Sequence, residues 1–155
     1  MHPIPSALME EPLSHRQLAA QTYNETWTLL EAARSPAEDL DLLGHAFASR
    51  YHWSIAGGAQ EKAIADWMAS RCCAAVGAGD LAVRFADSAL ALAPADAAHW
   101  LLASLHEGRA RAAAAAGDAA GRSSHIALAQ AALDAETDAE DRDAIASQLA
   151  DVPFA

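Results

Sequence analysis

The chain has 155 residues with 21 acidic and 10 basic side chains, and its formal net charge is −11 at pH 7. A chain this acidic repels phosphate groups, so we expect no binding to nucleic acid or to an anionic membrane, and a basic partner is favoured. More than a quarter of the residues are Ala, the strongest helix former, which favours helices that approach one another closely.

The first twelve residues contain three prolines and predict an irregular arm at residues 1–12, followed by a single helical-repeat domain at residues 13–150. The arm has neither a basic head nor an apolar run, which argues against secretion. No stretch approaches 18 apolar residues without polar interruption, so we expect no membrane-spanning segment and a cytoplasmic location. The first helix is predicted over residues 13–33, with apolar side chains on one side at Leu18, Tyr23, Trp27 and Leu30.

The second helix is predicted over residues 36–56, between a clear start signal and a clear stop signal. Ser35 can cap the helix, and Glu38 can reach back to the amide of that cap. Two consecutive glycines after residue 56 end the helix. We expect its large apolar residues, which recur at helical spacing, to form the buried stripe: Leu40, Leu43, Phe47, Tyr51 and Ile55.

Five further helices are predicted, over residues 59–76, 81–93, 97–116 and 119–135, with a short last helix after residue 137. Four of them follow a residue type that commonly caps helices: Asp80, Asp96, Asp118 and Thr137. Short turns join all of these segments, so consecutive helices should pack as antiparallel neighbours.

A repeated unit is the most informative feature of the chain. The run Gly77–Asp80 opens one Ala-rich helical segment, and Gly117-Asp118 opens a second such segment 40 residues later. A period of this size, built from paired helices, is typical of a stacked helical array.

Residues 63–94 resemble a tetratricopeptide unit. With Gly77 as the turn residue, two small residues and a closing proline fall where that repeat has them: Ala82, Ala89 and Pro94. Residues 40–135 are also similar to small bacterial tetratricopeptide-like proteins that have no assigned activity. The resemblance implies an all-α, right-handed array of antiparallel helix hairpins with about seven helices, and it implies no reaction.

The second helix carries three large side chains in a row, Tyr51, His52 and Trp53, which cover nearly its whole circumference and cannot all enter one core. Tyr51 continues the expected buried stripe, so His52 or Trp53 must face a neighbouring helix, another subunit or a ligand. A cluster of aromatic, imidazole and guanidinium groups suits an anionic or aromatic ligand. The predicted ligand-binding residues, for which plain packing among alanines is the alternative interpretation, are His52, Trp53, Trp67, Arg71, Trp100 and His106.

Other candidates for chemistry are weaker. Two pairs of histidines, each seven residues apart, share a helix face: His45 with His52, and His99 with His106. Seven residues correspond to about 10 Å of helix, too far for one metal ion to bridge, and a site would need a carboxylate such as Asp41 or Glu107 as well. The adjacent Cys72 and Cys73 lie in mid-helix, so we expect reduced thiols without a catalytic role. We therefore predict no metal and no cofactor.

These features together favour a non-catalytic module that binds a protein or a peptide on the open side of the array. One alternative is a small-molecule sensor or enzyme with a His/Trp/Arg pocket between the second, third and fifth helices. Another is a homodimer in which exposed apolar residues of the short array are covered by a second copy.

Overall fold

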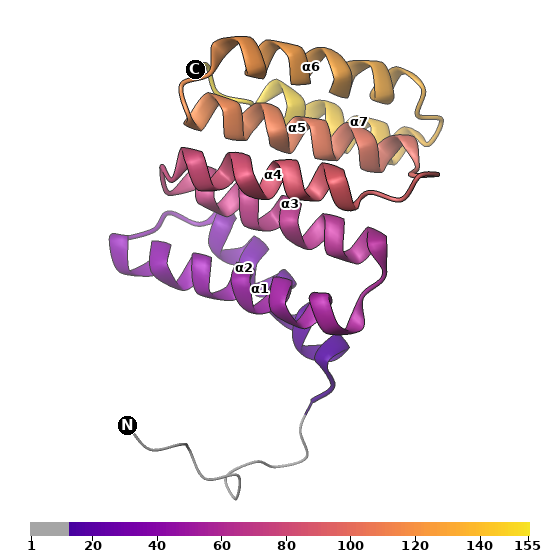
Figure 1. Ribbon diagram of the computed structural model, residues 1–155. Coiled ribbons are helices and arrows are strands. Elements are labelled where there is room, and N and C mark those ends of the chain that lie inside the picture. The colour runs from indigo at the N-terminus through magenta and orange to yellow at the C-terminus, as the bar shows by residue number, and fades with distance from the viewer. Residues whose placement is uncertain (1–12) are drawn as a thin grey trace, which may run out of the picture.

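The computed structural model describes residues 13–155, and helices make up most of that range (Figure 1). No strand occurs among these residues, and none of their helices is both long and apolar enough to cross a membrane. The predicted arm at residues 1–12 lies outside the described residues. The helices are α1 (His15–Glu31), α2 (Pro36–Ala56), α3 (Ala59–Ala75), α4 (Gly79–Leu92), α5 (His99–Ala115), α6 (Ala119–Asp134) and α7 (Ala139–Ala150).

Consecutive helices pair as hairpins, and the hairpins stack into one array. Helix α1 packs on α2, α3 on α4 and α5 on α6, while α7 packs on both α5 and α6. Contacts of α3 with α2 and of α5 with α3 and α4 join one hairpin to the next. Figure 1 shows the helices stacked from α1 and α2 at one end to α6 and α7 at the other. The predicted all-α array of helix hairpins is confirmed.

Two turns of the array have the same conformation. Gly77 after α3 and Gly117 after α5 have φ angles of 79° and 75°, in the left-handed region that glycine adopts without strain. In both turns the residue after the glycine donates its backbone N–H five residues back, from Ala78 to Cys73 and from Asp118 to Ala113, each at 2.9 Å. This bond satisfies a carbonyl at the helix end. The 40-residue repeat of the sequence is thus also a repeat of turn geometry.

Small side chains set the spacing of the helices. Between α1 and α2, the buried Ser49 donates its hydroxyl to the backbone oxygen of Ala19 at 2.9 Å. Between α3 and α4, Ser70 donates to the backbone oxygen of Ala82 at 2.8 Å. Helix backbones come within reach of a serine hydroxyl only where no large side chain separates them. Ser49 and Ser70 therefore face their partner helices, opposite the buried Ala19 and Ala82.

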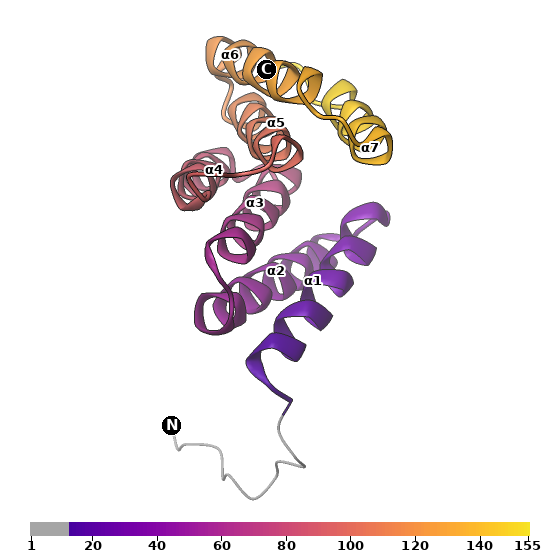
Figure 2. The same ribbon diagram turned by 90° about the vertical axis from the view of Figure 1, so that its right-hand side faces the viewer.

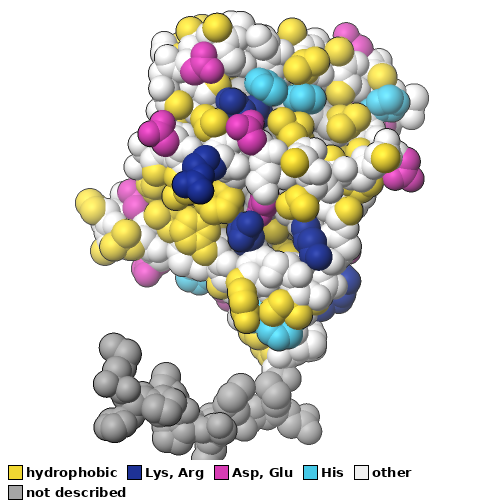
Figure 3. Space-filling view, viewed as in Figure 1, with side chains coloured by type: hydrophobic (Ala, Val, Ile, Leu, Met, Phe, Trp, Pro, Cys, Tyr) yellow, Lys and Arg dark blue, Asp and Glu magenta, His cyan; other side chains and the backbone are white. Residues whose placement is uncertain are grey.

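The predicted buried stripe of α2 is wrong at three positions. Leu40 is 70% exposed, Tyr51 59% and Ile55 52%, whereas the buried residues of α2 are Leu42, Ala46 and Ser49. The face of α2 that packs on α1 carries Ser49, which reaches the backbone of Ala19, and the side chains of Leu40, Tyr51 and Ile55 lie on the exposed side. Figure 3, viewed from the α4 side, shows hydrophobic side chains next to basic ones on this outer face.

Three predicted helix caps are also wrong. Helix α7 is capped by Asp138 and not by Thr137, and the Asp138 side chain accepts the backbone N–H groups of Glu140 and Asp141. Helix α4 begins after Ala78, and Asp80 lies in its first turn, where its negative charge interacts favourably with the helix dipole. Helix α5 begins after Ala98, and Asp96 does not cap it. Instead, the carboxylate of Glu136, from the segment after α6, accepts the backbone N–H of Trp100 at 2.8 Å. A side chain distant in sequence thus satisfies the start of α5.

Candidate functional site: the inner groove

Four helices enclose a groove along one side of the array. In Figure 2, α1 and α7 stand on the side opposite α4, with α3 and α5 between them. All four helices line a cavity of about 220 Å³. We call this surface, from α1 across α3 and α5 to α7, the inner groove. Its lining residues in this cavity include Tyr23, Trp27, Ile64, Trp67, Trp100, Ser104, Asp141 and Ala144.

The centre of this cavity is aromatic. The ring of Trp27 lies 5.9 Å from that of Trp67 and 6.5 Å from that of Tyr23, measured between centroids. Trp67 is only 6% exposed, and its indole Nε1–H has no hydrogen-bond partner among residues 13–155. Burial also raises the pKa of Tyr23. An unpaired buried donor is costly for a protein, so the packing that holds the indole in this place must offset that cost.

Gly108 makes room for this indole. A Cβ at position 108 would lie 2.4 Å from Cδ1 and 2.7 Å from Nε1 of Trp67, closer than atoms can approach. Glycine in the middle of a helix costs about 1 kcal/mol relative to alanine. Glycine is thus needed at position 108, because only a residue without a Cβ leaves space for the edge of Trp67.

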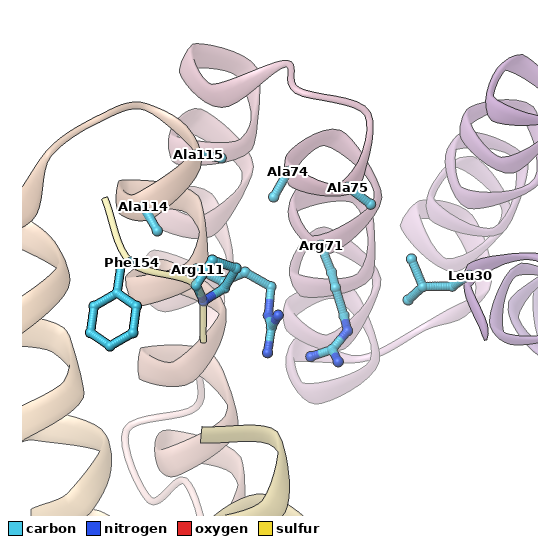
Figure 4. Close-up of a pocket in the computed structure, with 9 residues that line it drawn as sticks. Leu30, Arg71, Ala74, Ala75, Arg111, Ala114, Ala115 and Phe154 are labelled. Atoms are coloured by element: carbon cyan, nitrogen blue, oxygen red, sulfur yellow. The ribbon is translucent and has the colours of Figure 1, made fainter. Parts of the chain in front are cut away.

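A second cavity, of about 500 Å³, continues the inner groove toward the ends of α3 and α5. Figure 4 shows the guanidinium groups of Arg71 and Arg111 side by side, with Leu30 and Phe154 on opposite sides. Alanines of α3 and α5 form much of the remaining lining: Ala74, Ala75, Ala114 and Ala115. The cavity therefore combines small apolar side chains with two cations.

A single buried carboxylate holds both guanidiniums. Nη1 of Arg71 lies 3.2 and 3.3 Å from the two oxygens of Glu107, and Nε and Nη2 of Arg111 donate to Oε1 of Glu107 at 2.9 and 2.6 Å. Glu107 is fully buried, and each arginine side chain is 14% exposed. Two guanidiniums on one carboxylate leave one net positive charge in this cluster.

Arg71 also links the cluster to the aromatic cavity. Its guanidinium carbon lies 5.4 Å from the centroid of Trp27 and 5.6 Å from that of Trp67, within cation–π range. Burial lowers the pKa of Arg71, and Glu107 acts in the opposite direction. Nε and Nη2 of Arg71 donate no hydrogen bond to any residue between 13 and 155. These donors are available to a ligand.

The end of α7 and the segment after it lie beside the second cavity, which Pro153 and Phe154 help to line. Arg111 donates to the backbone oxygens of Gln148 at 3.0 Å and Asp151 at 3.3 Å. Arg122 of α6 donates to the backbone oxygens of Val152 at 3.0 Å and Pro153 at 2.5 Å, and Val152 is buried. These bonds hold the segment beside Arg111.

The structure brings three of the six predicted site residues together in the inner groove. Trp67 and Trp100 line the aromatic cavity, and Arg71 lies between it and the second cavity. Trp53 lies close by, in a separate cavity of about 230 Å³ that shares Tyr23 and Ile64 with the aromatic one.

The two predicted histidines lie elsewhere. His52 contacts His15 between α1 and α2, with their Nδ1 atoms 2.7 Å apart. His106 contacts His125 between α5 and α6, with 3.0 Å between their Nδ1 atoms. Each pair shares one N–H···N hydrogen bond, so these imidazoles connect the helices of a hairpin rather than line the groove.

The predicted ligand-binding residues do not include Tyr23, Trp27, Glu107 or Arg111, which carry the aromatic and ionic groups of the groove. The sequence pattern places Tyr23 and Trp27 on the apolar side of the first helix and indicates Glu107 only as a possible metal ligand. Glu107 and Arg111 are four residues apart in a segment that is otherwise rich in alanine. Charged residues on a buried helix are rare unless they are paired. The spacing of four residues therefore indicates an ion pair on one face of this helix.

The groove is suited to binding. Within residues 13–155, no group of three or more His, Cys, Asp or Glu side chains has the geometry to hold a metal ion. Burial raises the pKa of Cys72 to about 12 and that of Cys73 to about 11, which keeps both as thiols. The groove offers aromatic surface and guanidinium donors, both of which are recognition groups.

Comparisons with protein-family models, with curated proteins and with solved structures find no match for this chain. The case for a function therefore rests on the geometry of the inner groove.

Proposed function

We propose that the protein is a non-catalytic interaction module that binds a segment of a partner protein in the inner groove. The observation that supports this most strongly is the pair of adjoining cavities along α1, α3, α5 and α7. An open groove that crosses several stacked helices suits a linear segment, because each stacked unit adds contacts along its length.

A tetratricopeptide-like identity is part of this proposal. The two small residues that the resemblance places at helix crossings, Ala82 and Ala89, are buried in α4, and Pro94 follows the end of that helix. A cytoplasmic location and self-association through the exposed apolar side chains of α2 and α4 remain predictions.

A charge placed in the groove tests the proposal. Ala75 is exposed, lines the second cavity and lies in the last turn of α3, so Ala75→Glu obstructs the groove without disturbing the core. Ala91 is exposed in the last turn of α4 and lines none of the cavities described above, so Ala91→Glu is the matched control for charge and for the helix dipole.

Both variants and the wild type are applied to an array of short peptides of varied composition. We expect the wild type and Ala91→Glu to bind the same peptides, and Ala75→Glu to bind them at least tenfold more weakly. Equal binding by all three proteins, or no peptide retained by the wild type, contradicts the proposed function.

A further inference from the structure

We propose that the inner groove recognises a segment in which an aromatic side chain and a carboxylate are two residues apart. The aromatic side chain enters the cavity of Trp27, Trp67 and Trp100, and the carboxylate binds the guanidiniums of Arg71 and Arg111. This inference rests on the proposed function and names the class of ligand that the groove takes.

The aromatic cavity fits a neutral ring. Trp27, Trp67 and Trp100 line it, and aromatic rings gain energy from offset or edge contacts with one another beyond the area they bury. Next to the rings of Trp27 and Trp67 a cationic side chain is disfavoured, because Arg71 already lies against both rings and repels a second positive charge; Asp141 lines the cavity from α7.

The indole of Trp67 meets a ligand through its ring surface. Nε1 of Trp67 is buried without an acceptor, and this edge of the ring packs against Gly108 of α5. The N–H is therefore closed to a ligand, and the ring offers the cavity an apolar aromatic surface.

The charge of the arginine cluster favours a carboxylate as the second group of the ligand. Arg71, Arg111 and Glu107 carry a net charge of +1 inside a chain whose total is −11. Arg71 retains donors free of protein partners, and guanidinium groups pair with carboxylates through two parallel hydrogen bonds. The net charge of the chain favours a basic partner, whereas the local charge of this cluster favours an acidic group at the second cavity.

The distance between the two subsites sets the spacing of the motif. Trp67 and Arg71 are one helical turn apart on α3, which corresponds to about 6 Å of rise. In an extended peptide, residues i and i+2 lie on the same side and are separated by about 6.6 Å. An aromatic residue and an acidic residue with one residue between them therefore reach both subsites at once.

Capped heptapeptides test the motif against the full-length protein. Two peptides contain one Trp and one Glu two residues apart, in either order; matched peptides replace Glu by Gln or Trp by Ala. The indole N–H signals of the four tryptophans are followed by NMR with 15N-labelled protein and assigned with single Trp→Phe variants. We expect at least one Trp/Glu peptide to shift the Trp67 signal, because the inserted ring lies beside this indole, and its Gln and Ala counterparts to bind at least tenfold more weakly.

A variant that fills the aromatic cavity provides an independent test. Ala144 is exposed on α7 and lines this cavity, whereas Ala146 is exposed on α7 and does not. We expect Ala144→Phe to weaken binding of the Trp/Glu peptide at least tenfold and Ala146→Phe to change it less than twofold.

The outcomes separate this inference from the proposed function. Suppose that Ala75→Glu abolishes peptide binding, but Ala144→Phe or the exchange of Glu for Gln in the peptide leaves binding unchanged. The groove is then the binding site and the proposed ligand class is wrong. If no peptide binds in a manner that depends on Ala75, both proposals are overturned.

Discussion

Replacement of Glu107 by Gln removes the charge that holds two cations inside the inner groove. Glu107 is fully buried and accepts hydrogen bonds from both Arg71 and Arg111, which are 14% exposed. Without the carboxylate, the two guanidiniums face each other with little solvent to screen them. Loss of one member of a buried ion cluster typically costs about 3–5 kcal/mol, and we expect Glu107→Gln to lose about that much unfolding free energy.

Urea unfolding followed by circular dichroism measures this loss. Glu25→Gln is the control, because Glu25 pairs with His45 at 3.3 Å on the surface, with side-chain exposures of 43% and 37%. Exposed pairs contribute about 0–1 kcal/mol, so this variant should remain close to the wild type. A loss of less than about 1 kcal/mol in Glu107→Gln refutes the assignment of Glu107 as the residue that holds the two arginines.

A triple variant then separates stability from recognition. Arg71→Met, Glu107→Leu and Arg111→Met together replace the ionic cluster with apolar side chains of similar size. Buried ion clusters exchanged in this way often lose no stability, so the triple variant should recover most of the stability that Glu107→Gln loses. It should nevertheless fail to bind an acidic peptide. A triple variant less stable than Glu107→Gln would show that folding itself requires the charges.

Three further predictions follow from the packing. Gly79→Ala should lower the unfolding free energy in urea by about 1–3 kcal/mol, because its Cβ would lie 2.5 Å from the backbone oxygen of Ala115. Gly44→Ala should raise the unfolding free energy by about 0.5–1 kcal/mol, because no atom lies within 4 Å of a Cβ there. Equal effects of the two variants contradict the close approach at Gly79. Burial lowers the pKa values of His106 and His125, so the unfolded chain binds more protons than the folded chain as the pH falls through about 6.5. The unfolding free energy should therefore decrease in this pH range. If the double His→Gln variant shows the same dependence of unfolding free energy on pH, the two histidines are not its origin. Cys72 and Cys73 are buried with raised pKa values, so a thiol reagent should modify them only at the rate of unfolding, and rapid labelling of the native protein contradicts their burial.

The order and number of the helices could be predicted because their ends carry local chemical signals. Ser35 and Glu38 form the expected capping box, and Asp118 accepts the backbone N–H of Gly121 at the start of α6. Gly77 and Gly117 end α3 and α5 in the same left-handed conformation. Such signals act within a few residues, so the sequence alone reveals them.

The orientation of α2 could not be predicted from hydrophobicity. A pattern of large apolar residues indicated that Leu40 and Tyr51 are buried, yet the face that packs on α1 carries Ala46 and Ser49. In an alanine-rich array, closeness of the backbones decides which face is buried, and small or weakly polar residues permit that closeness. The cap of α5 by Glu136 depends on the tertiary fold and has no local signal.

The site could be predicted in part. Trp67, Arg71 and Trp100 were identified as members of an aromatic and guanidinium cluster, and they do line the inner groove. Their partners Trp27 and Glu107 come from other helices, and only the packing of α1 and α5 against α3 brings them together. Histidines at helical spacing did not predict the cross-helix pairs that the structure contains.

Chemical-shift mapping of the backbone amides locates the binding surface. The full-length protein, labelled with 15N, is titrated with the array peptide that it binds most tightly. We predict shifts concentrated on α1, α3, α5 and α7, in the residues that line the two cavities. Shifts confined to α2, α4 and α6 would place the partner on the outer face and contradict a role for the inner groove.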